Sequence, residues 1–198
     1  MVVKVGNAVK GFAVADRVLV QTGTLPEDGT MIGTFQQYMR VRPTRTTKVS
    51  IGIPPNLSFE EAVTVPSGVA SSALPLFSRD EGAQSAKLIA PHEEGGRERY
   101  AGQPILILGG ATSLGQYAIQ FARLTGFSPI VTTASLHNAD LLKSLGATHV
   151  LHRKLYTETL VKEACVIAGK HFELVYDAVS KSDTLVAAYQ ATAPQGIS

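Results

Sequence analysis

From residue 105 onward, short apolar runs alternate with segments in which apolar residues recur at helical spacing. The runs predict buried strands, and the segments between them predict helices. The expected strands are 105–108, 130–133, 148–151 and 174–177, and the expected helices are 114–124, 139–145, 157–168 (capped by Thr157) and 182–192. Strands and helices in this alternation form parallel βαβ units, and continuously apolar strands fit a sheet that is covered on both faces.

The part of the chain before residue 58 has a different pattern, which is typical of a β-rich structure. Short β-prone runs at 2–5, 17–21 and 37–41 are separated by Gly, Asn, Asp and Pro residues that favour turns. We therefore expect two domains. The first spans residues 1–57, and the second, with the α/β pattern, spans residues 58–198.

A helix and a long polar segment connect these two patterns. Ser58 is a suitable N-cap, because two glutamates follow it in the first helical turn. We expect Pro66 to interrupt this helix, and the small residues at 67–73 predict a second helical segment that ends near Phe77. Residues 78–103 are polar and contain glycine, so they are expected to form a loop, either as an insertion or as a linker.

The expected strand 105–108 runs into a turn of small residues that opens the next helix. A dinucleotide site needs this context, because the backbone must approach the diphosphate and the helix N-terminus supplies free amides and a positive dipole end. Gly110 and Gly115 match the first and third glycines of G-x-G-x-x-G, and Thr112 replaces the second. A hydroxyl there is able to donate to a phosphate. The residues expected to bind the nucleotide in this turn are Gly109, Gly110, Thr112, Ser113, Leu114 and Gly115. The alternative is a tightly packed turn that binds no ligand.

The end of the second strand indicates which dinucleotide is bound. NAD sites place an Asp or Glu about 20 residues beyond the turn, where it holds the ribose 2′-hydroxyl. The segment 132–135 has no acid, which favours NADPH over NADH because a carboxylate would repel the 2′-phosphate. Ser135 and His137 are able to donate to this phosphate, and Arg153 to pair with it bidentately. The alternative is that Ser135 is an ordinary turn residue and that the other two side chains are simply solvated.

The composition of the chain narrows the range of protein classes to which it can belong. The chain has 198 residues, 44% of them hydrophobic, and a net charge of +2, so it can bury a core and shows no preference for nucleic acid or an anionic membrane. It contains no apolar run long enough to span a bilayer and no signal pattern at its start, so we expect a soluble, cytoplasmic protein. Cys165 is the one cysteine, and the histidines lack metal-ligand spacing. We therefore expect no metal site and a packing role for Cys165.

Several motifs resemble the medium-chain dehydrogenase/reductase superfamily, and its zinc-independent quinone-oxidoreductase and fungal enoyl-reductase-like branch in particular. The similar segments are the glycine- and valine-rich stretch 3–20, Gly-Thr-Phe-Gln-Gln-Tyr at 33–38, the proline-led helix at 53–73, the turn and helix at 109–122, Ser-Leu-Gly-Ala at 144–147 and Phe-Glu-Leu-Val-Tyr-Asp at 172–177. Together they cover nearly the whole chain. The resemblance implies a partial Rossmann sheet preceded by part of a GroES-like β-rich domain. It also implies that this chain enters the first domain partway and stops before the remaining strands.

The resemblance also implies a reaction. Without zinc, the family transfers a hydride from NADPH to an activated C=C bond or a quinone, as in enones and enoyl thioesters. By resemblance Ser67 and Gly68 lie beside the nicotinamide, the alternative being tight helix packing. Asp177 lies at the carboxyl edge of the sheet, where ligands bind, the alternative being that it caps the following loop. No catalytic residue is assigned.

The sequence is therefore compatible with two functions. The first is an NADPH-dependent reductase of a small-molecule substrate, and the second is a catalytically inactive, truncated nucleotide-binding remnant. Some fungal relatives act as partners of a polyketide synthase, which is a further expectation from the resemblance. A sheet that ends with the strand 174–177 would leave an exposed edge, and a homodimer would cover it.

Overall fold

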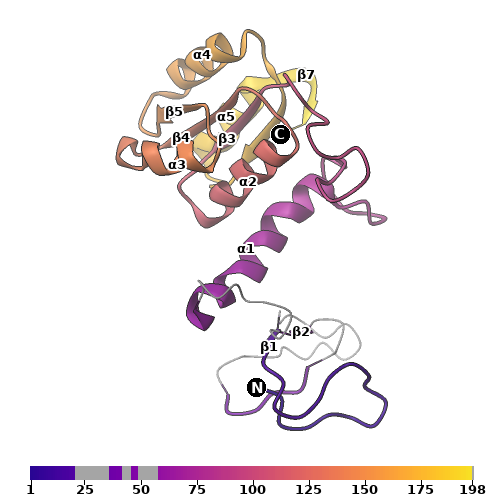
Figure 1. The fold of residues 1–198 in the computed structure, drawn as a ribbon. Helices are drawn as coiled ribbons and strands as arrows, with labels where there is room; N and C mark the ends of the chain where they lie inside the picture. Colours follow the sequence, from indigo (N-terminus) through magenta and orange to yellow (C-terminus); the bar gives the residue numbers. More distant parts are fainter. Residues whose placement is uncertain (21–35, 42–45, 49–57, 198) are drawn as a thin grey trace. The chain divides into compact units, whose positions relative to one another are not determined.

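The computed structural model describes residues 1–20, 36–41, 46–48 and 58–197 (Figure 1). The chain forms two compact units, Met1–Ser67 and Gly68–Ser198. Among the described residues, no helix combines the length and the apolar character that crossing a membrane requires.

The first unit contains a small antiparallel pair of strands. β1 (Val18–Val20) pairs with β2 (Thr46–Lys48), so the strand predicted at 17–21 is confirmed over three residues. The strands predicted at 2–5 and 37–41 are wrong, because neither run is a strand in the structure. In the first of them, Val2 exchanges two backbone hydrogen bonds with the 15–16 turn and the pairing extends no further. Residues 33–35 and 53–57 of the motifs quoted above lie outside the described residues.

α1 (Phe59–Phe77) begins with a capping box. The Glu61 amide donates to Ser58 Oγ over 3.1 Å, and the Ser58 amide donates to the Glu61 carboxylate over 2.8 Å. This reciprocal pair satisfies two backbone donors at the helix start, as predicted for Ser58. The predicted interruption at Pro66 is wrong, because α1 is continuous. Pro66 has no amide to donate to residue 62, but the helix continues through it to Phe77.

The second unit is built on a five-stranded parallel sheet with the order β5-β4-β3-β6-β7 (Figure 1). The strands are β3 (Ile105–Leu108), β4 (Ile130–Ala134), β5 (His149–His152), β6 (Phe172–Asp177) and β7 (Thr192–Ile197). The helices are α2 (Ser113–Leu124), the short 3₁₀ turn η3 (Leu136–Asn138), α3 (Ala139–Leu145), α4 (Thr157–Ala168) and α5 (Ser182–Ala191). The predicted alternation of four strands with helices is confirmed.

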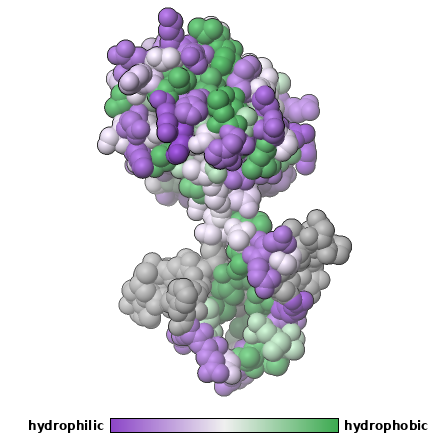
Figure 2. Space-filling model, turned by 90° about the vertical axis from the view of Figure 1, so that its left-hand side faces the viewer, coloured by the Kyte–Doolittle hydropathy of each residue, from purple (hydrophilic) through white to green (hydrophobic). Residues whose placement is uncertain are grey.

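The core lies on both faces of β3, whose side chains alternate between them. Ile105 and Ile107 pack in one cluster with residues of α2, and Leu106 and Leu108 pack in a second with residues of α4 and α5. All four side chains are buried. The face of this unit seen in Figure 2 intersperses hydrophilic with hydrophobic residues. The continuous apolar run at 105–108 thus has the two-sided burial that its sequence predicts.

The C-terminal end of the described chain differs from the prediction. α5 ends at Ala191, and Thr192 begins β7, a fifth strand that lies parallel to β6. The expectation that the sheet ends with the strand 174–177 is therefore wrong. Pro194 and Gly196 disfavour strand structure, so the local pattern gave no signal for β7. Thr157 is the first residue of α4 and not its cap, which is Tyr156.

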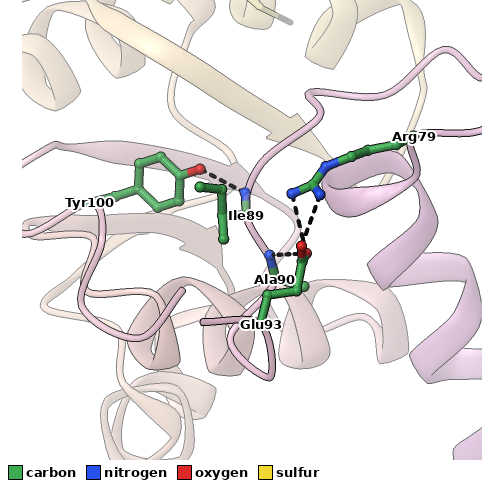
Figure 3. Close-up of polar contacts among 5 residues, drawn as sticks. All are labelled: Arg79, Ile89, Ala90, Glu93 and Tyr100. Atoms are coloured by element: carbon green, nitrogen blue, oxygen red, sulfur yellow. Dashed lines mark hydrogen bonds and ion pairs between the residues drawn. The ribbon is translucent and has the colours of Figure 1, made fainter. Parts of the chain in front are cut away.

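An ion pair organises the polar segment 78–103 (Figure 3). The Arg79 guanidinium donates to both carboxylate oxygens of Glu93, over 2.8 and 3.2 Å. The same carboxylate accepts from the Ala90 amide over 2.9 Å. The amide of Ala90, and then Arg79, hold the pKa of Glu93 below its usual value, so this carboxylate stays charged at neutral pH.

Tyr100 attaches the same segment to the core. Its hydroxyl accepts from the Ile89 amide over 2.8 Å (Figure 3). Its ring stacks on Phe127, with the centroids 4.9 Å apart. These contacts give residues 78–103 a defined path along the second unit, although the segment contains no helix or strand.

We expect Tyr100→Phe to lower the free energy of unfolding by about 0.5–1.5 kcal/mol, because the ring contacts remain and one hydrogen bond is lost. Urea unfolding followed by circular dichroism measures the change. The matched control is Tyr189→Phe, since Tyr189 is 80% exposed. Equal losses in the two variants would show that the Tyr100 hydroxyl does not anchor the segment.

Candidate functional site

The turn between β3 and α2 is attached to the end of β4. The Gly109 amide donates to Thr133 Oγ1 over 2.9 Å, and the Gly110 amide donates to the Thr133 carbonyl over 3.0 Å. Gly109 has a φ of +82°, in the left-handed region that favours glycine. The side-chain hydroxyl and the backbone carbonyl of Thr133 thus fix the path of the backbone as it leaves β3.

This turn leaves no space for side chains at its glycines. A Cβ on Gly110 would lie 2.2 Å from Thr132 Oγ1, and one on Gly115 would lie 2.3 Å from the Gly109 carbonyl oxygen. The second contact is with backbone, so moving a side chain cannot relieve it. The first turn of α2 therefore packs directly against the glycine turn, which is the close helix–strand packing that the third glycine of a dinucleotide-binding motif allows.

Thr112 caps α2 at the position where the family motif has its second glycine. Its Oγ1 accepts from the Gly115 amide over 3.0 Å, and its backbone is extended. The hydroxyl hydrogen stays available for donation to a ligand. The amides of Ser113 and Leu114 lie in the first helical turn, where no intrahelical acceptor exists. The start of α2 thus offers two amides and a hydroxyl to an anion.

A cavity of about 510 Å³ opens beside this turn, at the carboxyl ends of the strands. It brings together five of the residues predicted to bind the cofactor: Gly109, Thr112, Ser135, His137 and Arg153. The Arg153 amide donates to the Ala134 carbonyl over 2.9 Å, which fixes the backbone of this arginine beside the end of β4. Gly110, Ser113, Leu114 and Gly115 belong to the turn but do not line the cavity.

Sequence reasoning missed other residues of the same wall. The cavity is also lined by Leu108, Ala111, Thr133, Ala134, Asn138, Leu155, Thr157, Leu160, Val179, Lys181, Asp183, Thr184 and Ala187. Leu155, Leu160, Val179 and Ala187 give it an apolar side that suits an aromatic base. The signal for Lys181 was its place just after β6, because the loops at this edge of a parallel sheet carry the ligand contacts.

The remaining predicted residues have other surroundings. Ser67 is exposed on α1, in the first unit. Gly68 is buried, and a Cβ on it would lie 2.5 Å from Tyr117 Cε2, as the helix-packing alternative requires. The carboxylate of Asp177 accepts from the amides of Val179 and Ser180 over 2.9 and 3.1 Å and from Thr184 Oγ1 over 2.7 Å. Asp177 therefore has the loop-capping role that the sequence left open.

Two buried polar side chains lie beneath the start of α2. Ser72 is fully buried in α1 and donates to the Leu114 carbonyl over 3.0 Å. Tyr176, on β6, is hydrogen-bonded to Ser72. Burial raises the pKa of Tyr176, and the hydrogen bond acts in the opposite direction. The phenol is thus neutral at physiological pH, and it supports the segment of α1 that packs against α2.

The described residues contain no group of three or more His, Cys, Asp or Glu side chains that could hold a metal ion. Burial raises the pKa of the Cys165 thiol on α4. This thiol stays protonated at neutral pH and is a poor nucleophile.

The comparisons with known proteins agree with this geometry. A family model for zinc-binding dehydrogenases matches residues 113–197. A trans-enoyl reductase from Gibberella fujikuroi is 32% identical over 196 residues, which cover 99% of this chain and 51% of the relative. The crystal structure of an alcohol dehydrogenase superfamily protein from Novosphingobium aromaticivorans matches with a TM-score of 0.71 and 27% identity, over 98% of this chain and 50% of that chain. The crystal structure of the CurK enoyl reductase matches with a TM-score of 0.62 and 26% identity, over 98% of this chain and 49% of that chain.

The chain is thus similar, over 98–99% of its length, to a trans-enoyl reductase and to an alcohol dehydrogenase superfamily protein. The predicted fold class, a Rossmann-type parallel sheet preceded by part of a GroES-like domain, is confirmed. The chain spans about half the length of the curated relative just described. The division of the domains at residue 57 stays a prediction.

We expect Gly115→Ala to lower the free energy of unfolding by about 1–3 kcal/mol, because its Cβ must displace the Gly109 backbone. Ser113→Ala, in the same turn, adds no atom and is the matched control, with a change of about 0.5 kcal/mol or less. Thermal unfolding of the two variants checks this, and an unchanged stability of Gly115→Ala would contradict the packing described here.

Proposed function

We propose that this chain is the cofactor-binding part of an NADPH-dependent oxidoreductase that reduces an activated C=C bond or a quinone. The observation that carries the proposal is the cavity in which the glycine turn, Ser135, His137 and Arg153 meet. The name of the trans-enoyl reductase from Gibberella fujikuroi supports the reaction class.

The residues present fit such a cofactor. The turn has no space for a Cβ at Gly109, Gly110 or Gly115, and the amides of Ser113 and Leu114 would hold the diphosphate together with the Thr112 hydroxyl. Ser135, His137 and Arg153 would hold the 2′-phosphate, because they lie at the end of β4 and beyond β5. Within the described lining of the cavity the single carboxylate is Asp183, and it lies at the start of α5, beyond β6.

Bound NADPH supplies the hydride for reduction of an enone, a quinone or an enoyl thioester. The chain's own contribution is to bind and orient the cofactor. That Ser67 and Gly68 lie beside the nicotinamide ring stays a prediction from the family resemblance. Asp177 would act indirectly, by holding the segment 178–184 that forms one wall of the cavity.

We further propose that this chemistry needs no resident zinc, because Cys165 is the one cysteine of the sequence and its thiol is protonated and half-buried. A cytoplasmic location, a homodimer and a polyketide synthase partner stay predictions.

The cofactor assignment is tested by fluorescence titration with NADPH and NADH. We expect NADPH to bind more tightly, and Arg153→Gln to weaken NADPH by about tenfold while leaving NADH unchanged, because a hydrogen-bonded charge is lost from the 2′-phosphate. Lys154→Gln is the matched control, since Lys154 is also exposed and does not line the cavity. Tighter binding of NADH by the wild-type chain would overturn the assignment.

The reaction class is tested by following NADPH absorbance with an enone, a quinone and an enoyl thioester as acceptors. We expect oxidation that depends on one of these acceptors and that is lost in Gly115→Ala. NADPH binding without oxidation would instead favour the inactive remnant.

A further inference from the structure

The segment between β6 and α5 forms a fixed wall of the cavity, and hydrogen bonds determine its path. Asp177 accepts from Val179, Ser180 and Thr184, and Thr184 Oγ1 also accepts from the Lys181 amide over 3.0 Å. The Lys181 carbonyl accepts the first backbone bond of α5. The backbone of Lys181 is thus held at the cavity by bonds of its own amide and carbonyl, and its side chain is not needed for them.

This wall lies beside the diphosphate turn. A Cβ on Gly109 would lie 2.4 Å from Val179 Cγ2, so the residue two positions before Lys181 contacts the turn. In the strand order, β6 is the neighbour of β3 on one side, whereas β4 and then β5 follow on the other. Lys181 comes after β6 and Arg153 comes after β5. The two cations therefore approach the turn from opposite sides.

The lining of the cavity has more basic than acidic side chains. It contains two basic side chains, Arg153 and Lys181, and the carboxylate of Asp183. Within the part of the chain that the structure describes, neither cation has an ion-pair partner within 4.0 Å. Both side chains are exposed, so each is able to turn towards an anion in the cavity. A cavity with two unpaired cations on opposite sides suits a ligand with two separate phosphate groups.

We propose that Lys181 binds the diphosphate of the cofactor, whereas Arg153 reads the 2′-phosphate. The proposal rests on the proposed function and assigns a separate task to each cation. NADPH and NADH share the diphosphate, so Lys181 sets the affinity for both. The 2′-phosphate is present only in NADPH, so Arg153 sets the preference between them.

The experiment measures the dissociation constants of NADPH and NADH for the wild-type chain, Lys181→Gln, Lys181→Arg and Arg153→Gln. We expect Lys181→Gln to weaken both cofactors by the same factor, about fivefold to tenfold, through loss of a charged contact. We expect Lys181→Arg to stay within about twofold of the wild type, because the charge is kept. For Arg153→Gln we instead expect a weaker affinity for NADPH alone, so that the dissociation constant of NADH divided by that of NADPH falls. Raising the salt concentration should reduce the effect of Lys181→Gln.

Lys143→Gln is the matched control, because it removes an exposed positive charge from α3, away from the cavity. Unchanged constants in Lys181→Gln, a loss confined to NADPH, or an equal loss in Lys143→Gln would each overturn the assignment of Lys181. These results leave NADPH binding by the wild type intact. If the wild type binds neither cofactor, the proposed function fails, and the assignment of Lys181 fails with it.

Discussion

The close contact between the start of α2 and the glycine turn is the constraint on which the site depends. Gly115 lies against the carbonyl of Gly109, at a separation that allows no Cβ. This contact is possible because Gly115 has no Cβ, and the turn is held in place by the hydrogen bonds of its amides to Thr133 on β4. Thr112, the N-cap of α2, lines the cavity, and the amides of the first helical turn follow it directly in the chain.

The other walls of the cavity follow from the order of the strands. β5 and β6 lie on opposite sides of the β3–β4 pair, so the loops after them bring Arg153 and Lys181 to the same cavity although 28 residues separate them in the sequence, by their numbering. Asp177 stabilises one of these loops by accepting three hydrogen bonds. Asp177 thus stabilises a wall of the cavity, although it does not line the cavity itself.

Much of this arrangement could be predicted from the sequence, because the deciding signals are local. The strand 105–108 is a continuous apolar run, and the turn after it has glycines at fixed spacing. β7 could not be predicted, since Pro194 and Gly196 disfavour a strand and its pairing with β6 is a tertiary contact. Lys181 was missed for a similar reason, because its position depends on which strand lies next to β3. The opposite error occurred at residues 2–5, where a strand was predicted and none formed. A run of β-prone residues forms a strand only where a neighbouring strand pairs with it.

The most direct measurement of the central claim is a titration of the ¹⁵N-labelled chain with NADPH, followed by amide chemical shifts. We expect the largest shifts at the amides of Ser113 and Leu114, with smaller shifts at Ser135 and Arg153. Amide shifts confined to the opposite end of the sheet, at Gln103 and Ala193, would contradict the claim, because that region contains no part of the glycine turn.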